Sequence, residues 1–357
     1  MSGSDFEVGL VGFGLAGAAF HAPLISTTPG LHLKTAVTRD VQRRELARSR
    51  HPDVQLADSL TGLLEQGGHD LVVIATPNRL HAPLAREALD AGVSVVVDKP
   101  LAVSAAEAAQ LVRQAATGEH LLSVFQNRRW DGDFLTISDL VASGALGQVW
   151  RLESRFERWV PTPKSGWREL PDPAEAGGVL FDLGAHLVDQ VLLLFGPVAT
   201  VYAELDQRRP GAQVTDDAFV ALTHANGVRS HLSMSSTTAQ RGPRFRLVGD
   251  AGGYTKYGLD VQEAALRSGD RPGGPDWGQE SEHAWGLLGT DGDVRPVPTK
   301  AGAYPEYYER IVAALRGDAP VPVDAADAVH VLEVIESAQA SADSGRAVEL
   351  SADSSSS

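Results

Sequence analysis

The chain has 357 residues, of which 43% are hydrophobic and 22% are charged. This is the composition of an ordinary globular protein, and the length favours two domains over one. A formal net charge of -15, with no basic run in the sequence, argues against nucleic acid or an anionic membrane surface as a partner. We therefore expect a small molecule as the partner.

Cysteine is absent, which excludes a disulfide framework, a cysteine-based zinc site and a thiol nucleophile. The first residues, MSGSDFEVGL, lack a basic segment followed by an apolar one, and no run of about 18 apolar residues is present. We expect a cytoplasmic enzyme without a membrane partner.

From Phe6 to Phe125 short apolar runs alternate with helical stretches, a pattern typical of βαβ units. The runs are nearly continuous in Val, Leu and Ile, as in parallel strands that helices cover on both faces. We predict that residues 1–126 form a Rossmann-like, doubly wound parallel sheet. The predicted strands are FEVGLVG, LHLKTAV, LVVIAT, VSVVV and LLSVF, and the clearest helices are PLAREALDAG and AAEAAQLVRQA.

The first turn of this domain has a G-x-G-x-x-G spacing. Gly12 permits a tight turn, Gly14 lets the backbone approach a pyrophosphate, and Gly17 lets the following helix pack on the strand. The N–H groups at the start of that helix suit phosphate. The strand before and the helix after favour a dinucleotide site over a purely structural turn. The residues expected at the cofactor are Gly12, Phe13, Gly14, Leu15, Ala16 and Gly17.

The second predicted strand ends in AVTRD, where an acid would bind the ribose of NAD. Thr38 and Arg39 occupy this turn instead, and a guanidinium suits the 2′-phosphate of NADP. We therefore predict NADP as the preferred cofactor, with NAD as a possible one. In the alternative, Arg39 begins the solvent face of the next helix and Asp40 meets the ribose.

Asp98, Lys99 and Pro100 follow the apolar run VSVVV, at the sheet edge where ligands bind. Lys99 is one of only five lysines, so its place there is informative. Its ammonium could hydrogen-bond a substrate hydroxyl or take part in proton transfer. In the alternative, Lys99 only ends a strand in solvent. Pro100 permits a cis Lys99–Pro100 bond, which the sequence leaves undecided.

The pattern changes after residue 126. VWRLESRFERW, ATVYAEL, AFVALTH and VRSHLSMS predict longer antiparallel strands, and Asn226-Gly227 predicts a hairpin between the last two. Residues 268–300 predict a loop or an edge ribbon, and AYPEYYERIVAALRG and DAADAVHVLEVIESAQASA predict helices. We assign residues 127–350 to an α+β domain, and residues 351–357 to a disordered tail.

The segment GGVLFDLGAHLVDQ places Asp182, His186 and Asp189 on one helical stripe. Such a stripe is usually a solvated face, but the helix also contains glycines that an exposed helix would not favour. A metal site is a second alternative; because no denser ligand cluster accompanies the stripe, we predict none. Histidine has a pKa suited to accepting a hydroxyl proton, so His186 is the predicted base.

Asn127 and Arg128 follow the last predicted Rossmann strand. With Arg129 and Trp130 they could line the substrate pocket, but an arginine pair at a domain hinge, here Arg128 and Arg129, is as often an interdomain salt bridge.

Together the glycine loop, D-K-P and G-G-V-L-F-D-L-G-A-H-L-V-D resemble the Gfo/Idh/MocA family of NAD(P)-dependent oxidoreductases, over nearly the whole chain. Asp98 stands where the family usually has Glu, and Ala176 where a third glycine is common. FHAPLI, SVFQNRRWDGDFLT and the WRE triplet are most similar to the NADP-dependent scyllo-inositol dehydrogenase-like branch.

The resemblance implies a catalytic triad of Lys99, Asp182 and His186, and a second domain whose open, largely antiparallel sheet mediates oligomerisation. In this implied site, Lys99, Asp182 and His186 also bind the substrate, with Asn127 and Arg128 as candidates beside them. Asp98 and Lys99 are expected to border the cofactor as well. The further residues implied near the nicotinamide are Thr76, Pro77, Asn78, His81, Trp167 and Arg168.

These features predict an NADP-preferring dehydrogenase or reductase of a polyol, inositol or sugar, assembled as a homodimer or homotetramer. Two alternatives stay open: a regulator of the same fold that binds NADP without turnover, and a reductase of a non-sugar carbonyl. An acid/base histidine argues against the first.

Overall fold

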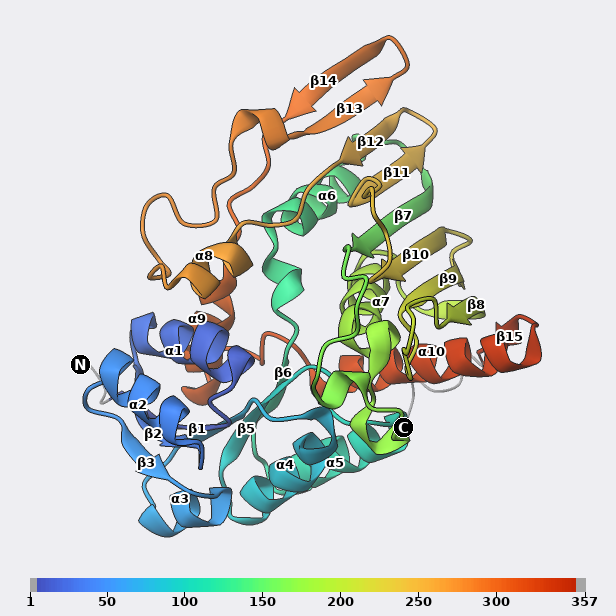
Figure 1. Ribbon diagram of the computed structural model, residues 1–357. Helices are drawn as coiled ribbons and strands as arrows, with labels where there is room; N and C mark the ends of the chain where they lie inside the picture. Colours follow the sequence, from blue (N-terminus) through green and yellow to red (C-terminus); the bar gives the residue numbers. More distant parts are fainter. Residues whose placement is uncertain (1–4, 351–357) are drawn as a thin grey trace. The chain divides into compact units, whose positions relative to one another are not determined.

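The structure, a computed structural model, describes residues 5–350, and its contacts divide the chain into two units (Figure 1). Unit 1 contains the residues up to Trp130 together with Val261–Trp277 and Ala303–Val329. Unit 2 contains Asp131–Asp260, Gly278–Gly302 and, of the described residues that follow, 330–350. This division differs from a single boundary at residue 126, because two later segments pack with the first unit. The predicted disordered tail, residues 351–357, lies outside the described residues.

Unit 1 is built on a six-stranded sheet in the order β3-β2-β1-β4-β5-β6. All its pairings are parallel, so the doubly wound fold is confirmed. The strands are β1 (Phe6–Val11), β2 (Leu31–Val37), β3 (Gln55–Ala57), β4 (Leu71–Ile74), β5 (Ser94–Asp98) and β6 (Leu122–Phe125). The sequence did not predict β3, because three residues with one exposed position leave no apolar run.

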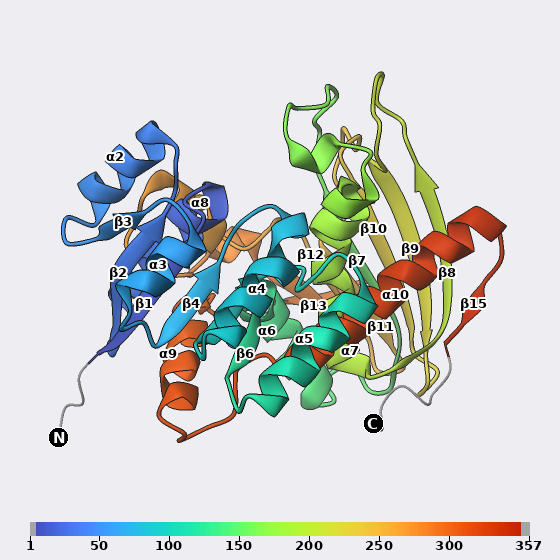
Figure 2. The same ribbon diagram turned by 90° about the horizontal axis from the view of Figure 1, so that it is seen from below.

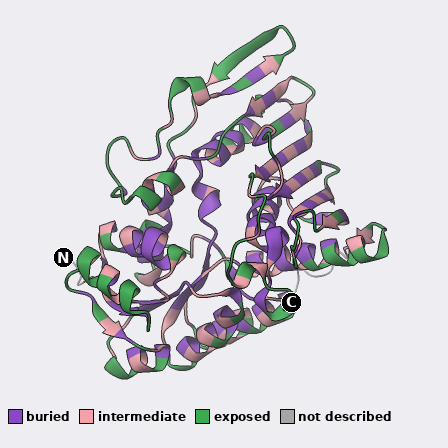
Figure 3. Cartoon of the chain, in the orientation of Figure 1, coloured by how far each residue is buried: buried purple, intermediate pink, exposed green. Residues whose placement is uncertain are grey.

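Helices cover both faces of this sheet, with α1 and α2 on one face and α3, α4 and α5 on the other (Figure 1). Accordingly, every residue of β4 is buried, whereas α2, one of the covering helices, is largely exposed (green in Figure 3). The helices of unit 1 are α1 (Ala22–Thr27), α2 (Val41–Arg50), α3 (Leu60–Gln66), α4 (His81–Asp90), α5 (Ala105–Thr117), α8 (Gln262–Ser268) and α9 (Tyr304–Leu315). The tyrosines of α9 are fully buried, as their spacing predicts: Tyr304, Tyr307 and Tyr308.

Unit 2 contains a nine-stranded sheet in the order β14-β13-β12-β11-β7-β10-β9-β8-β15. All its pairings are antiparallel except β7 with β10, which is parallel. This exception to the prediction arises because the chain between the two strands includes a helix, α7, as a parallel crossover requires. The strands are β7 (Val149–Glu157), β8 (Val198–Asp206), β9 (Asp217–His224), β10 (Arg229–Ser235), β11 (Phe245–Gly249), β12 (Gly253–Lys256), β13 (Gly286–Thr290), β14 (Asp293–Val297) and β15 (Val348–Glu349).

The structure contains the predicted hairpin and the predicted edge ribbon of this sheet. The β9–β10 hairpin turns at Asn226-Gly227, where Gly227 has a φ of 88°. The β13–β14 ribbon forms an edge of the sheet within the Gly/Pro-rich segment.

Three helices belong wholly or partly to unit 2: α6 (Gly132–Ala142), α7 (Ala185–Phe195) and α10 (Ala325–Ser344). In Figure 2, α7 and α10 lie along one face of the nine-stranded sheet. The helical stretch Pro173–Phe195, which includes α7, is long and apolar enough to cross a membrane, but 78% of its apolar 18-residue window is buried inside the protein. It therefore has the character of a core helix.

Candidate functional site

The glycine loop joins β1 to a π-helical turn, Ala16–His21, that continues into α1. A Cβ atom on Gly12 would lie 2.4 Å from the Ala75 carbonyl oxygen, and one on Gly17 would lie 2.0 Å from the Gly12 carbonyl oxygen. Both positions therefore exclude any side chain. A Cβ atom on Gly14 would meet only Arg43 Nη1, at 3.8 Å. The backbone at Gly14 is thus open to a close approach, as a pyrophosphate requires.

The other residues of the glycine loop differ in how far they are buried. Phe13 is buried in the core and Leu15 is exposed, while Gly14 and Ala16 are half-buried. Thr76 lies beside Gly12 at the end of the neighbouring strand, and its buried hydroxyl has no partner among the described residues. These features fit a dinucleotide, whose polar groups would meet the loop N–H groups and this hydroxyl.

Basic side chains follow β2. Arg39 is exposed and its Nε donates to the carbonyl oxygen of Asp58 at 3.0 Å. The Asp40 carboxylate caps α2 by accepting from the Arg43 N–H at 2.9 Å, so the alternative role of Asp40 on a ribose competes with the helix cap. Arg43 reaches the glycine loop, as its position near Gly14 shows. Thr38 is buried at the strand end.

The residues after β5 are fixed by side chains of unit 1. Asp98 Oδ1 accepts the main-chain N–H of Lys99 at 2.9 Å, and the Lys99–Pro100 bond is cis. Pro100 is held by His81, whose Nδ1 lies 2.7 Å from the Pro100 carbonyl oxygen. His81 Nε2 lies 2.9 Å from the Thr76 carbonyl oxygen, so this ring ties the loop after β4 to the loop after β5. Pro77 is half-buried and Asn78 is buried in the same loop.

In unit 2, Asp182 lies in a π-helical turn, Leu180–Gly184, directly before α7, which carries His186 and Asp189. Only 7% of His186 and 2% of Asp189 are exposed, so the stripe is not a solvated face. Among the described residues no group of three or more His, Asp or Glu side chains could hold a metal ion. The π-turn separates Asp182 from the regular helix, an irregularity that is frequent at functional sites.

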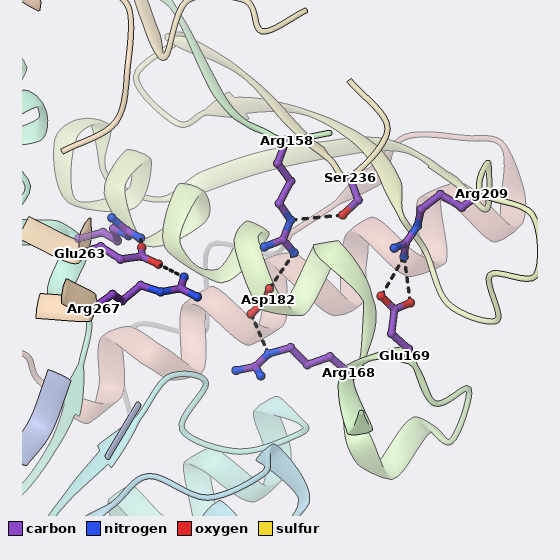
Figure 4. A network of polar contacts seen from close by, with 9 residues as sticks. Arg158, Arg168, Glu169, Asp182, Arg209, Ser236, Glu263 and Arg267 are labelled. Atoms are coloured by element: carbon purple, nitrogen blue, oxygen red, sulfur yellow. Dashed lines mark hydrogen bonds and ion pairs between the residues drawn. The ribbon is translucent and has the colours of Figure 1, made fainter. Parts of the chain in front are cut away.

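Two arginines hold Asp182 (Figure 4). Arg168 Nε donates to Asp182 Oδ1 at 3.0 Å, and Arg158 Nη2 donates to Oδ2 at 3.3 Å. The Arg168 guanidinium also lies over the half-buried ring of Trp167, 4.2 Å from its centroid. Both carboxylate oxygens of Asp182 are therefore oriented, and the charged form is compensated.

Asn127 and Arg128 are buried in unit 1. The Arg128 guanidinium forms an ion pair with Glu263 and donates to the Tyr304 hydroxyl at 3.1 Å, while Arg129 pairs with Asp327 at 2.9 Å. All of these partners belong to unit 1, so the contacts are salt bridges within one unit and do not test the predicted interdomain salt bridge.

The comparisons with known proteins agree with this geometry. Residues 6–126 match the model of the "Oxidoreductase family, NAD-binding Rossmann fold", and residues 138–350 match that of the "Oxidoreductase family, C-terminal alpha/beta domain". The chain belongs to the Gfo/Idh/MocA oxidoreductase family. It is an oxidoreductase, and its first domain is the nucleotide-binding Rossmann fold of that family.

Individual relatives are similar over nearly their full length. The chain is 33% identical to the "scyllo-inositol 2-dehydrogenase (NADP(+)) IolW" of Bacillus subtilis, over 96% of each chain. It is 40% identical to the uncharacterized oxidoreductase YdgJ of Escherichia coli, over 93% of this chain and 95% of that one. A crystal structure of an oxidoreductase from Bacillus cereus has a TM-score of 0.86 at 29% identity, over 97% of this chain and 99% of that one.

Sequence reasoning missed several residues that contact the predicted site residues, among them Arg43, Arg158 and His21. The arginine pair in VQRRE, directly after AVTRD, was a visible signal for Arg43. Arg158 lies 24 positions from Asp182 in the chain, a separation that no local pattern reveals.

Proposed function

We propose that this protein is an NADP-preferring oxidoreductase that transfers a hydride between the nicotinamide and a secondary alcohol or ketone of a polyol, inositol or sugar. The observation that carries the NADP preference is the turn after β2 and the start of α2, where Arg39 and Arg43 are exposed and the acid of the AVTRD turn, Asp40, caps the helix. The name of IolW, an NADP-dependent scyllo-inositol dehydrogenase, supports the same cofactor and substrate class.

A bound nicotinamide would supply the acceptor or donor of the hydride. The protein would supply the proton chemistry and the orientation of the substrate. His186 accepts the hydroxyl proton during oxidation and returns it during reduction. Asp182, oriented by Arg158 and Arg168, binds a neighbouring substrate hydroxyl or holds the His186 tautomer, and the Lys99 ammonium polarises the reacting oxygen.

The experiment that tests this function is a panel of inositols, other polyols and aldoses, each offered with NADP or NAD, with reduction followed by absorbance. The proposal expects turnover of at least one polyol or sugar, with a higher kcat/KM for NADP. NADP binding by calorimetry without turnover of any panel member would favour a regulator of the same fold. Turnover of simple ketones or aldehydes alone would favour a reductase of non-sugar carbonyls.

We also propose a cytoplasmic homodimer or homotetramer, formed through the nine-stranded sheet. The face of this sheet opposite α7 carries Tyr202, which is 37% exposed, and the ring pair of Phe219 and His231, 5.9 Å apart. Light scattering at micromolar concentration should give the mass of two or four chains. A monomer under these conditions would contradict this assembly.

A further inference from the structure

A line of polar side chains, two of them fully buried and the third, Asp98, half-buried, lies behind the main chain of Lys99 in unit 1. The His21 ring is fully buried, and its Nδ1 lies 2.6 Å from the hydroxyl of Tyr308, which is also fully buried. The other ring nitrogen, Nε2, lies 4.0 Å from Asp98 Oδ1 and has no hydrogen-bond partner among the described residues. The same Asp98 oxygen accepts the Lys99 N–H. The line therefore runs from α9, through the helix after the glycine loop, to the residue before Lys99.

Aromatic rings fix the orientation of this imidazole. The His21 ring centroid lies 4.4 Å from that of Phe125 and 6.2 Å from that of Tyr308. Tyr307 packs edge-on against both Phe125 and Tyr308. His21 consequently keeps one nitrogen toward Tyr308 and the other toward Asp98.

The groups at the two ends determine which nitrogen carries the proton. A carboxylate only accepts, so the His21 proton belongs on Nε2, facing Asp98, and the Tyr308 hydroxyl donates to Nδ1. Burial lowers the pKa of His21 to about 4, so the ring is neutral near neutral pH, even though the Asp98 carboxylate opposes this shift. Both donors in the line therefore point toward Asp98: the Tyr308 O–H toward His21 Nδ1, and the His21 Nε2–H toward the carboxylate.

We propose that Tyr308, His21 and Asp98 are positioning residues for Lys99. Tyr308 and His21 orient the Asp98 carboxylate, which accepts the Lys99 main-chain N–H. The three residues thereby set the direction in which the Lys99 side chain extends from the end of β5. This inference rests on the proposed function only in assigning Lys99 a part in the reaction. Packing alone does not explain the residues, because apolar side chains would fill the same space and leave no buried nitrogen without a partner.

The mildest test removes one hydroxyl. Tyr308→Phe keeps the ring and deletes the donor to His21, and it should lower kcat about 10-fold while KM changes less than about 2-fold, because misplacing a reacting group by about 1 Å costs up to about 100-fold in rate. Tyr307→Phe is the matched control, since it deletes an equally buried hydroxyl, bonded to Ser123 at 3.0 Å, outside the line. Its kcat should stay within about 2-fold of wild type.

Two substitutions of Asp98 test the role of its carboxylate. Asp98→Asn removes the charge that orients His21 and should lower kcat at least as much as Tyr308→Phe. Asp98→Glu restores a carboxylate and should recover most of that loss. Equal losses for Asn and Glu would contradict a role for the charge.

A readout without substrate separates this inference from the proposed function. The chain has only five lysines, so reductive methylation with carbon-13 formaldehyde gives a simple NMR spectrum, in which Lys99→Arg identifies the Lys99 signal. Tyr308→Phe and His21→Gln should shift that signal and leave the other lysine signals unchanged. Tyr307→Phe should shift none of them.

The outcomes are distinguishable. A Lys99 signal that does not move, or equal loss of kcat in Tyr308→Phe and Tyr307→Phe, would overturn the positioning role. A Lys99 signal that moves in a protein that turns over no polyol or sugar would support the positioning role and contradict the proposed function.

Discussion

The neighbours of Arg39 and Asp182 in the structure add to the roles that the sequence predicts for these two residues. Asp182 is predicted from its spacing to His186, and the structure adds two guanidiniums that orient both of its oxygens. Arg39 is predicted from the end of the second strand, and the structure adds Arg43 as a second cation and commits Asp40 to a helix cap. In both cases neighbouring charged side chains determine which group the residue is suited to bind.

Arg39→Asp should reverse the cofactor preference. An arginine on a phosphate contributes charge-assisted hydrogen bonds of about 1.5–3 kcal/mol, and each 1.4 kcal/mol corresponds to about 10-fold in affinity. We therefore expect kcat/KM for NADP to fall about 10- to 100-fold relative to that for NAD, measured with the same substrate. Arg48→Ala, an exposed arginine on the following helix, α2, is the control and should alter neither value. Equal losses with both cofactors would mean that Arg39 does not read the 2′-phosphate.

At the scale of elements, two glycines of the six-residue glycine loop have different roles, one in folding and one in cofactor binding. Gly17 has no room for a side chain, whereas Gly14 has room. Gly17→Ala should lower the free energy of unfolding by about 1–3 kcal/mol, the usual cost of overpacking. Gly14→Ala should leave stability within about 1 kcal/mol and weaken NADP binding, because its methyl group would occupy the path of the pyrophosphate. Urea unfolding and calorimetry on both variants check this; equal destabilisation by the two substitutions would contradict the distinction.

The elements that the sequence predicted correctly are those with local patterns. The apolar runs of β1, β2, β4, β5 and β6, the turn at Gly227 and the helices α4, α5, α9 and α10 each carry their signal within a few residues. The three-residue strand β3 has no such signal. The π-turn around Asp182 also has none, because it depends on how the helix packs. The line from Tyr308 to His21 joins residues 287 positions apart, so only the folded chain brings it together.

At the scale of the whole molecule, buried histidines make stability depend on pH. Burial lowers the pKa of His21 to about 4, and it also lowers the pKa values of His81 and His224. The unfolded chain binds protons near pH 6.5 that the folded chain excludes, so stability is lost as pH falls through 6.5 and this loss levels off near the folded pKa. For His21 alone, the change from about pH 7 to about pH 5 corresponds to about 2 kcal/mol.

Urea unfolding at these two pH values and one protein concentration measures the effect, and His21→Gln should make the dependence shallower. Stability that is unchanged or higher at about pH 5 would show that these histidines are not buried in their neutral form.

The central claim is that turnover requires Lys99 of unit 1 together with His186 of unit 2. The most direct measurement is NADPH formation by wild type, Lys99→Ala and His186→Ala with the best polyol of the panel, alongside NADP binding by calorimetry. We predict that each substitution lowers kcat by at least about 100-fold, in the range of general acid–base catalysis, while the Kd for NADP changes less than about 3-fold. Retained turnover in either variant, with NADP still bound, would contradict the claim.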